Sequence, residues 1–326
     1  MKIGVIGAGA WGTTLALHYQ KIGSNVTIWS RDEELNETFR ETGENIKYLP
    51  GFKFNKNGLR ITNDPKEFSN NSYDAVLVTI PTQTIRKVLA NFSLDNANII
   101  ICSKGIEETT LKLMHEVVEE VFPNSKTAML SGPNLALGIA QSLPASTLIA
   151  SKHSEIKKIT DKSSSISFKF HFSEDIIGAQ IFGACKNVLG IACGILRGLE
   201  VGENYFYYFL SQGTKEISEL CITLGGSEET VFTPAGLGDI VLTCTGNKSR
   251  NNKLGYEIAI NLDKNVEEVI KNTNLLSEGY TTAKSLYSLL KNKGIKSPIL
   301  ESVHNILYEN ESAVILKKLI SLEKVS

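Results

Sequence analysis

The chain has 326 residues, which is enough for two domains, and 42% of them are hydrophobic, which is enough for a sizeable core. Its 34 basic residues are balanced by 35 acidic ones, which excludes a protein that binds nucleic acid or an anionic membrane through bulk charge. A small anionic ligand stays open, because it needs only one local site.

Cysteine and histidine patterns narrow the class of protein further. The five cysteines include no CxxC pair and the five histidines no HxxxH or HExxH pattern, so we expect neither a disulfide framework nor a metal site. The apolar N-terminal stretch is broken by glycines, unlike a signal peptide, and no run of about 18 apolar residues predicts a membrane span. We therefore expect a soluble protein of the reducing cytoplasm.

Strands and helices alternate along residues 1–175. Lys2–Ile6 is predicted to be a strand, a helix follows from about Trp11 to Lys21, and Asn25–Trp29 is the next strand. Further predicted strands are Ala75–Ile80, Asn98–Cys102, Thr127–Leu130, Ser146–Ala150 and Phe168–Phe172, with the clearest intervening helix at Thr110–Phe122. Residues 44–62 are expected to be irregular. The alternation predicts an α/β domain with a parallel, doubly wound sheet.

Long helical patterns replace the strands after about residue 175. Helices are predicted at 176–199, 204–224, 252–260, 265–271, 280–292 and 298–307. We therefore divide the chain into an α/β domain at 1–175 and a mostly α-helical domain at 176–326.

The first strand is followed by GAGAWG at residues 7–12, a G-x-G-x-x-G motif. The motif alone is weak, but here it joins a strand to a helix, which is the context of a Rossmann-type dinucleotide site. Gly7 allows the tight turn, Gly9 lets a pyrophosphate approach the backbone, and Gly12 lets helix and strand pack closely. A tight turn that binds no ligand is the alternative.

The residues after the second strand, Arg31 and Asp32, indicate which dinucleotide binds. NAD sites usually place an acidic residue there against the ribose 2′-hydroxyl, whereas an arginine suits the 2′-phosphate of NADP. Arg31 therefore favours NADP, and Asp32 is close enough to keep NAD open. For Arg31 the alternative is an ordinary exposed turn residue.

Three further strand ends carry short polar segments: TIPTQT (79–84), CSKG (102–105) and SGPN (131–134). All three fall at the carboxyl edge of the predicted sheet, where open α/β sheets bind their ligands. Lys104 is the charged residue of these segments and a candidate for the site. A solvated loop lysine is the alternative.

The segment 176–196 contains a single charged residue, Lys186, with Asn187 beside it. A lysine in such apolar surroundings is expected to be partly desolvated, which favours its neutral form and makes it a usable proton donor and acceptor. No histidine lies in any motif, so Lys186 is the best acid/base candidate in the chain. The alternative is a lysine that extends from a core helix to solvent.

The stretch PAGLGDIVLTCTGNKSRNNK (234–253) joins a glycine loop, a short helical run and the start of another helix. Asp239 and Thr243 lie four residues apart and share one helix face. Ser249, Arg250 and Asn251 then offer a helix N-terminus, a forked guanidinium and an amide, which together suit a small phosphate. Plain helix capping by Ser249 or Asn251 is the alternative.

Together these segments resemble the bacterial-type soluble NAD(P)-dependent glycerol-3-phosphate dehydrogenases. GAGAWGTTLA, YLPG, SKGIE, SGPN, KNVLGIACGI, AGLGDIVLTCTGNKSRNN and SEGYTT are similar to motifs of this family and occur in its order. The resemblance implies reversible reduction of dihydroxyacetone phosphate to sn-glycerol 3-phosphate for glycerophospholipid synthesis. It also implies a cytoplasmic homodimer that uses NADP or NAD, needs no metal, binds no nucleic acid and does not insert into membranes.

The resemblance implies a role for each matching residue. Lys186 is the acid/base, and Lys104 is a second active-site lysine near substrate and nicotinamide. The residues implied to position the substrate and the catalytic lysine are Asn187, Asp239 and Thr243. Those implied to bind the substrate are Gly132, Asn134, Ser249, Arg250 and Asn251. Those assigned to the cofactor are Gly7, Gly9, Ala10, Trp11, Gly12, Arg31, Lys104, Ala136, Arg250, Leu276 and Glu278.

Three positions depart from the family's pattern. Asn134 stands where threonine or serine is usual, Gly138 where glutamate is common, and Gln212 where many members have arginine. Two competing hypotheses stay open. One is another dehydrogenase with a Rossmann and a helical domain, of the 3-hydroxyacid/6-phosphogluconate or ketopantoate reductase type, which lacks the 235–252 block. The other is a non-catalytic nucleotide sensor, which should lack the buried lysine and the phosphate site.

Overall fold

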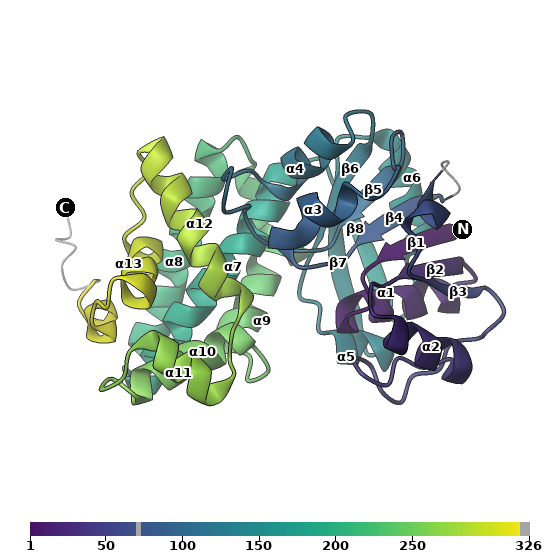
Figure 1. The fold of residues 1–326 in the computed structure, drawn as a ribbon. Helices are drawn as coiled ribbons and strands as arrows, with labels where there is room; N and C mark the ends of the chain where they lie inside the picture. The colour runs from purple at the N-terminus through teal and green to yellow at the C-terminus, as the bar shows by residue number, and fades with distance from the viewer. Residues whose placement is uncertain (70–72, 320–326) are drawn as a thin grey trace. The chain divides into compact units, whose positions relative to one another are not determined.

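The structure, a computed structural model, describes residues 1–69 and 73–319 and divides into two compact units (Figure 1). Unit 1 comprises Met1–Ser103 and Leu113–Ile176, and unit 2 comprises Lys104–Lys112 and Ile177–Ser326. The segment 104–112, which chain order assigns to the α/β domain, therefore groups with the helical unit. Residues 320–326, the end of the predicted helical domain, lie outside the described residues.

Unit 1 contains an eight-stranded sheet in the order β3-β2-β1-β4-β5-β6-β7-β8. Its strands are β1 (Lys2–Ile6), β2 (Asn25–Trp29), β3 (Leu59–Thr62), β4 (Ala75–Val78), β5 (Asn98–Ile101), β6 (Lys126–Ser131), β7 (Ala145–Ala150) and β8 (Phe168–Ser173). The chain builds outward from β1 to β3 and then returns to the other side of β1 with β4. This reversal of strand order is the doubly wound arrangement that the sequence predicts.

One pair of strands corrects the prediction of a parallel sheet. β6 and β7 are antiparallel, with Met129 opposite Ala150, whereas the other neighbouring strands pair in parallel. The connection between them, residues 132–144, contains the short helix α5 (Ala136–Ala140). β7 begins beside the end of β6, so the chain reverses direction between the two strands.

Residues 44–62 also differ from the prediction, which expects them to be irregular throughout. The last of them form β3, which extends the sheet by pairing in parallel with β2. Between several of the strands the sequence also predicts helices without giving their bounds, and the structure has four such helices in unit 1: α2 (Glu33–Thr42), α3 (Ile85–Leu89), α5 and α6 (Ser154–Ser163).

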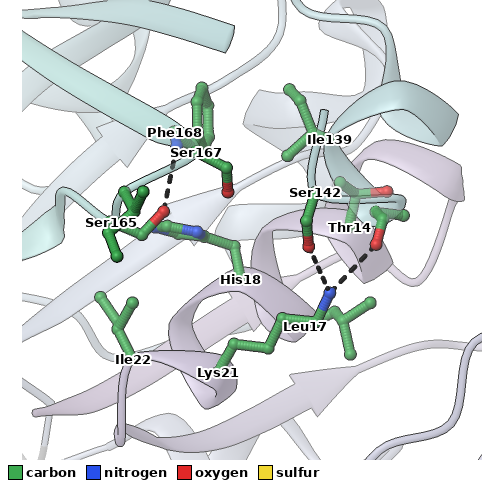
Figure 2. A pocket seen from close by; sticks show the side chains of 12 residues that line it. Thr14, Leu17, His18, Lys21, Ile22, Ile139, Ser142, Ser165, Ser167 and Phe168 are labelled. Carbon is green, nitrogen blue, oxygen red and sulfur yellow. Dashed lines mark hydrogen bonds between the residues drawn. The ribbon is translucent and has the colours of Figure 1, made fainter. Parts of the chain in front are cut away.

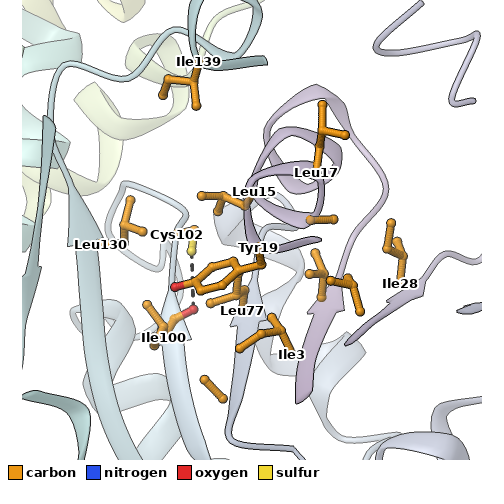
Figure 3. Packing of buried hydrophobic residues seen from close by; sticks show 14 of the residues in the cluster. Ile3, Leu15, Leu17, Tyr19, Ile28, Leu77, Ile100, Cys102, Leu130 and Ile139 are labelled. Atoms are coloured by element: carbon orange, nitrogen blue, oxygen red, sulfur yellow. Dashed lines mark hydrogen bonds between the residues drawn. The ribbon is translucent and has the colours of Figure 1, made fainter. Parts of the chain in front are cut away.

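The core of unit 1 lies between the sheet and the helix α1 (Ala10–Lys21). Figure 3 shows Ile3 of β1 and Leu77 of β4 facing Leu15 and Tyr19 of α1, and all four side chains are fully buried. Burial of each such side chain contributes about 1.5–3 kcal/mol. This packing fixes the start of α1 directly after β1 and so determines where the glycine loop lies.

Unit 2 is helical, as the sequence predicts. Its helices are α7 (Ile176–Gly198), α8 (Glu203–Thr223), α9 (Asp239–Thr245), α10 (Arg250–Ile260), α11 (Val266–Thr273), α12 (Glu278–Lys293) and α13 (Pro298–Tyr308). The helix α4 (Met114–Val121), in contrast, belongs to unit 1. Among the described residues, α7 is long and apolar enough to cross a membrane, but 94% of its apolar 18-residue window is buried inside the protein. Such burial is typical of the core helix of a soluble protein.

Glycines let α7 and α10 cross in direct backbone contact. A Cβ at Gly194 of α7 would lie 2.0 Å from the carbonyl O of Asn252, and a Cβ at Gly255 of α10 would lie 2.0 Å from the carbonyl O of Ile191. Any larger residue at either glycine would push the two helices apart. The crossing therefore fixes where the first turn of α10 lies relative to the middle of α7.

The N-terminus of α13 is capped by a carboxylate from another helix. Glu216 of α8 accepts hydrogen bonds from the hydroxyl of Ser297 (2.6 Å) and from the backbone N–H groups of Ile299 (3.0 Å) and Leu300 (3.4 Å). Burial raises the pKa of this carboxyl, and its hydrogen bonds lower it in part. The cap ties α13 to α8 in the helical core.

We predict that Glu216→Ala lowers the free energy of unfolding by about 2 kcal/mol, because three donors lose their acceptor. Since the folded pKa of Glu216 is raised, the wild type should also lose stability as pH rises from about 4.3 through that folded value, a dependence that Glu216→Gln should lack. Urea unfolding followed by circular dichroism measures both effects. The control is Glu219→Ala on the exposed face of α8, and equal stabilities of Glu216→Ala and this control would contradict the capping role.

Candidate active site

Unit 1 builds a tight loop between β1 and α1. Gly7 has a φ of +118°, in the region that favours glycine. A Cβ at Gly12 would lie 2.1 Å from the carbonyl O of Gly7, so helix and loop can pack only if this residue is glycine. A Cβ at Gly9, in contrast, would meet no described atom within 4 Å. Gly7 and Gly12 therefore shape the loop, whereas Gly9 borders open space.

This open space lies at the N-terminus of α1. Gly9 is the N-cap residue, and no side chain in the described part of the chain caps the helix. Ala10 and Trp11 begin α1, where backbone N–H groups have no acceptor within the helix. Such N–H groups bind anions, and the glycine leaves room for one to approach. The loop therefore fits the pyrophosphate of a dinucleotide.

The remaining predicted residues of unit 1 follow β2 and β6. Arg31 is exposed at the end of β2. Asn134 is attached to β7, because its side-chain Nδ2 donates to the carbonyl O of Ser146 (3.0 Å) and its Oδ1 accepts from the hydroxyl of Thr147 (2.8 Å). Gly132 also lies against β7, since a Cβ there would be 3.0 Å from the Cα of Thr147. Both residues thus hold the SGPN loop in place.

Ala136 begins α5, and its carbonyl O accepts a hydrogen bond from the hydroxyl of Thr14 in α1 (3.3 Å). The loop that follows β6 is therefore tied to the helix that follows the glycine loop. This hydrogen bond thus links two predicted segments of unit 1, the glycine loop and the SGPN loop, through the helices that follow them.

Unit 2 contains a buried cluster in which two lysines share one carboxylate. The Nζ of Lys186 lies 2.6 Å from Oδ1 of Asp239, and the Nζ of Lys104 lies 2.5 Å from its Oδ2. The Nζ of Lys186 also donates to the hydroxyl of Thr243, at 2.9 Å. Asp239 is 1% exposed and Lys186 9%. The cluster thus holds two lysines on one carboxylate, largely shielded from water, and a second carboxylate, Glu278, is close enough to raise the pKa of Lys104.

Burial and charge act in opposite directions on the lysine from the segment 104–112. Burial lowers the pKa of Lys104, the Asp239 carboxylate raises it, and the positive charge of Lys186 lowers it again, with burial the largest effect. The sequence predicts such an effect of desolvation for Lys186, and the structure shows it at Lys104. A lysine with a lowered pKa exchanges protons more readily near neutral pH.

Local folding explains why Asp239 and Thr243 face the lysines. The turn at Pro234–Gly238 precedes α9, and a Cβ at Gly236 would lie 2.4 Å from the carbonyl O of Thr230, so this turn needs a glycine. Asp239 is then the first residue of α9, and Thr243 is buried one turn further on. The i, i+4 spacing places both side chains on the face that meets α7.

A chain of amides lies next to the lysine cluster. The Nδ2 of Asn251 donates to Oδ1 of Asn187 (2.9 Å), and its Oδ1 accepts from the backbone N–H of Gly279 (2.9 Å). The Nδ2 of Asn187 lies 3.5 Å from Oε2 of Glu278, the first residue of α12. The structure thus connects the predicted residues of α7, α10 and α12.

Arg250 and Ser249 lie at the start of α10. Arg250 is exposed, and its Nη2 donates to the carbonyl O of Leu276 at 2.8 Å. Ser249 is the N-cap residue, and its hydroxyl accepts from the backbone N–H of Asn252 (3.2 Å). The capping that the sequence analysis held as the alternative for Ser249 is therefore present, and it leaves the guanidinium of Arg250 at the surface beside the helix N-terminus.

Sequence reasoning missed two buried asparagines that hold these segments. Asn45 donates to the carbonyl O of Ala8 in the glycine loop (2.8 Å), and Asn252 donates to the carbonyl O of Cys244 at the end of α9 (2.6 Å). Both are fully buried. Asn45 lies three residues before YLPG, and Asn252 is the last residue of the 235–252 block, so their positions beside or within the motifs were the available signal.

A cavity of about 300 Å³ in unit 1 lies apart from the predicted residues of that unit (Figure 2). His18 and Lys21 line it, and the Nζ of Lys21 bonds to the carbonyl O of Ala140 (3.0 Å) and to the hydroxyl of Ser142 (3.1 Å). Among the described residues, no group of three or more His, Cys, Asp or Glu side chains could hold a metal ion.

A doubly wound unit with an anion-binding glycine loop and a helical unit with a buried lysine–carboxylate–lysine cluster define a nicotinamide-dependent dehydrogenase of the two-domain class. Residues 2–157 match the family model of the NAD-dependent glycerol-3-phosphate dehydrogenase N-terminus, and residues 175–316 match that of its C-terminus. The chain belongs to this family.

Known proteins support the assignment over the full length. Glycerol-3-phosphate dehydrogenase [NAD(P)+] of Citrifermentans bemidjiense is 37% identical over 319 residues, which are 96% of this chain and 94% of that protein. The crystal structure of glycerol-3-phosphate dehydrogenase from Coxiella burnetii has a TM-score of 0.90 at 30% identity and covers 99% of both chains. The enzyme from Saccharomyces cerevisiae gives 0.85 at 27% identity, with 98% of this chain and 99% of that one covered. The predicted family, fold class and use of NAD(P) are confirmed.

We predict that Gly9→Ala impairs cofactor binding, whereas Gly12→Ala impairs stability. Gly9 has room for a methyl group, so Gly9→Ala should keep the melting temperature but weaken NADPH binding at least about tenfold by blocking the pyrophosphate. Gly12→Ala should instead destabilise unit 1, because its Cβ would overlap the Gly7 carbonyl. Thermal melting and fluorescence titration with NADPH measure the two properties. Unimpaired binding by Gly9→Ala would contradict the assignment of the open space.

We also predict that Asp239→Asn lowers the pKa of Lys104 further, because the carboxylate that favours its charged form is removed. The ammonium would then lose its proton at a lower pH than in the wild type. NMR titration of the labelled lysine side chains measures this shift. Thr243→Val is the matched control, since it removes a hydrogen bond to Lys186 but no charge; a titration of Lys104 that is unchanged in Asp239→Asn would argue against the shared carboxylate.

Proposed function

We propose that the protein catalyses the reversible reduction of dihydroxyacetone phosphate to sn-glycerol 3-phosphate, as its relatives' names imply. The observation that carries this proposal is the buried cluster of Lys104, Asp239 and Lys186, whose two lysine side chains suit an oxygen that gains negative charge during reaction. A metal ion, which could do the same, has no ligand group in the described part of the chain.

Lys186 is the acid/base of the proposed reaction. Its Nζ donates a proton to the alkoxide oxygen that forms at C2 of the ketone, and takes the proton back in the oxidative direction. Asp239 and Thr243 hold this ammonium group by hydrogen bonds of 2.6 and 2.9 Å. Lys104 stabilises the developing negative charge. The reduced nicotinamide, when bound, supplies the hydride.

Arg250 and Asn251 bind the substrate phosphate in this proposal, at the N-terminus of α10. A guanidinium has five N–H donors, and one of those of Arg250 bonds to Leu276. The others suit a phosphate, whose oxygens accept paired hydrogen bonds. A phosphate held there orients the ketone, and such orientation can lower the barrier by several kcal/mol. Gly132 and Asn134 complete the substrate residues.

We assign dinucleotide binding to the 1–175 domain and substrate binding to the 176–326 domain. Ala136, Leu276 and Glu278 line the cofactor in this assignment, and Arg31 gives a preference for NADP over NAD. The protein works in the cytoplasm as a homodimer, without nucleic acid or membrane insertion. Its product is a precursor of glycerophospholipids.

The test is NADPH oxidation with dihydroxyacetone phosphate and, separately, with unphosphorylated dihydroxyacetone. We expect turnover with the phosphate ester and at least about 100-fold lower kcat/KM without it, because charged hydrogen bonds of about 1.5–3 kcal/mol each are lost. Arg250→Ala should raise KM for the ester about tenfold or more and leave KM for NADPH nearly unchanged.

Lys248→Ala is the matched control for Arg250→Ala, since it removes an exposed cation two residues away. No turnover with either ketone, in protein that still binds NADPH, would contradict the proposed reaction and favour a nucleotide sensor or a substrate altered by Asn134, Gly138 and Gln212.

A further inference from the structure

The acidic residue after β2 is not available in the way that an NAD site requires. Oδ1 of Asp32 accepts from the backbone N–H of Leu35 (3.1 Å) and so caps α2. Its Oδ2 accepts from the Nζ of Lys47 at 2.8 Å. A ribose 2′-hydroxyl would have to share this carboxylate with both partners, each of which already uses one acceptor site. The residue that kept NAD open in the sequence is therefore already engaged by a lysine 15 positions further along the chain.

Lys47 is held beside Asp32 by the glycine loop itself. Asn45 donates from Nδ2 to the carbonyl O of Ala8 and to the hydroxyl of Thr13, both at 2.8 Å. Its Oδ1 accepts from the backbone N–H of Tyr48 (3.1 Å). Because Asn45 is fully buried, the short turn that carries Lys47 is fastened to the same loop that fits the pyrophosphate.

The side chain of Lys47 still has donors to offer. An ammonium group has three N–H donors, and Asp32 occupies one of them. The side chain is 55% exposed, so the ammonium group stays accessible to a ligand from solvent. The Nζ also lies 5.4 Å from the ring centroid of Tyr48, a distance at which a cation is attracted to the ring. Lys47 is thus pre-positioned, but not enclosed.

The local charge balance is positive. Arg31 and Lys47 carry two positive charges against the single negative charge of Asp32, and both cations lower the pKa of that carboxyl, Lys47 through its hydrogen bond first of all. Of the next acidic residues, Glu33 is paired with Arg40 at 2.8 Å, and Glu34 is exposed. A dianionic phosphate is favoured here over a neutral hydroxyl.

We propose that Lys47 is a cofactor-specificity residue, which binds the 2′-phosphate of NADP together with Arg31. The proposal rests on the function proposed above only in that the chain binds its dinucleotide at the glycine loop. Asp32 holds the ammonium at this place before the cofactor arrives, so little side-chain freedom is lost on binding.

A structural role alone would not explain Lys47. An exposed ion pair such as Lys47–Asp32 contributes little to stability. Replacing Lys47 should therefore leave the fold intact, while freeing one oxygen of Asp32 for a ribose hydroxyl. The preference for NADPH over NADH should therefore fall. A general loss of stability would instead affect both cofactors equally.

The experiment compares Lys47→Met with Lys47→Arg and with Lys53→Met, a control that removes an exposed lysine from the same segment. Steady-state kinetics give kcat/KM for NADPH and for NADH, and calorimetry gives the affinities of 2′,5′-ADP and 5′-AMP. We expect Lys47→Met to lower kcat/KM for NADPH and the affinity for 2′,5′-ADP about tenfold or more, with the values for NADH and 5′-AMP unchanged or raised. Lys47→Arg and Lys53→Met should keep the wild-type preference.

Two results would overturn the proposal: an unchanged ratio of 2′,5′-ADP to 5′-AMP affinity in Lys47→Met, or an equal loss for both cofactors. Failure of the proposed reaction gives a different result. In that case the wild type turns over no dihydroxyacetone phosphate with either cofactor, while the two adenosine phosphates still test Lys47 by binding alone.

Discussion

The carboxylate of Asp239 is the interaction on which the proposed site depends. It neutralises one of two positive charges that lie within hydrogen-bond distance in a buried place, and without it Lys104 and Lys186 would repel each other. Lys104 reaches Asp239 from the segment 104–112, which groups with the helical unit. The carboxylate thereby links this segment to α9 and α7.

Helix crossings hold this carboxylate in place. Gly194 and Gly255 let α7 and α10 touch through their backbones, and Asn252 then bonds to the last turn of α9, the helix that carries Asp239 and Thr243. The proposed acid/base lysine, its partner carboxylate and the residues proposed to bind the phosphate therefore lie on three helices that these contacts hold together. Geometry fixed in this way suits transition-state stabilisation, because a misplacement of about 1 Å can cost about 100-fold in rate.

Much of this could be predicted from the sequence, because the signals are local. Glycine spacing after β1, a lone lysine in an apolar helix, and the four-residue interval between Asp239 and Thr243 each follow from chain geometry alone. The direction of β7 could not be predicted, since residues 132–144 are long enough to carry the chain to either end of the sheet. The grouping of Lys104 with unit 2 could not be predicted either.

The residues that sequence reasoning did not identify are polar residues whose hydrogen-bond partners lie elsewhere in the chain. Asn45 matches no motif, and Asn252 is an uncharged residue of the 235–252 block to which no role was assigned, yet their buried side chains fasten the glycine loop and α9. Lys47 lies in a stretch that the sequence describes only as irregular, and its pairing with Asp32 appears once the turn is seen attached to the loop. Side chains of this kind are found by asking where buried polar groups bond, which requires a structure.

The central claim is that Lys186 transfers the proton. Its most direct test is single-turnover oxidation of bound NADPH by dihydroxyacetone phosphate in the variant Lys186→Met. The NADPH affinity and the melting temperature are measured on the same protein. Asp239 keeps Lys104 as a partner in this variant, so the fold should persist. Lys215→Met, at an exposed site on α8, is the control. We predict a rate at least about 100-fold below wild type with cofactor binding unchanged. A rate within a few-fold of wild type would contradict the acid/base assignment and shift that role to Lys104.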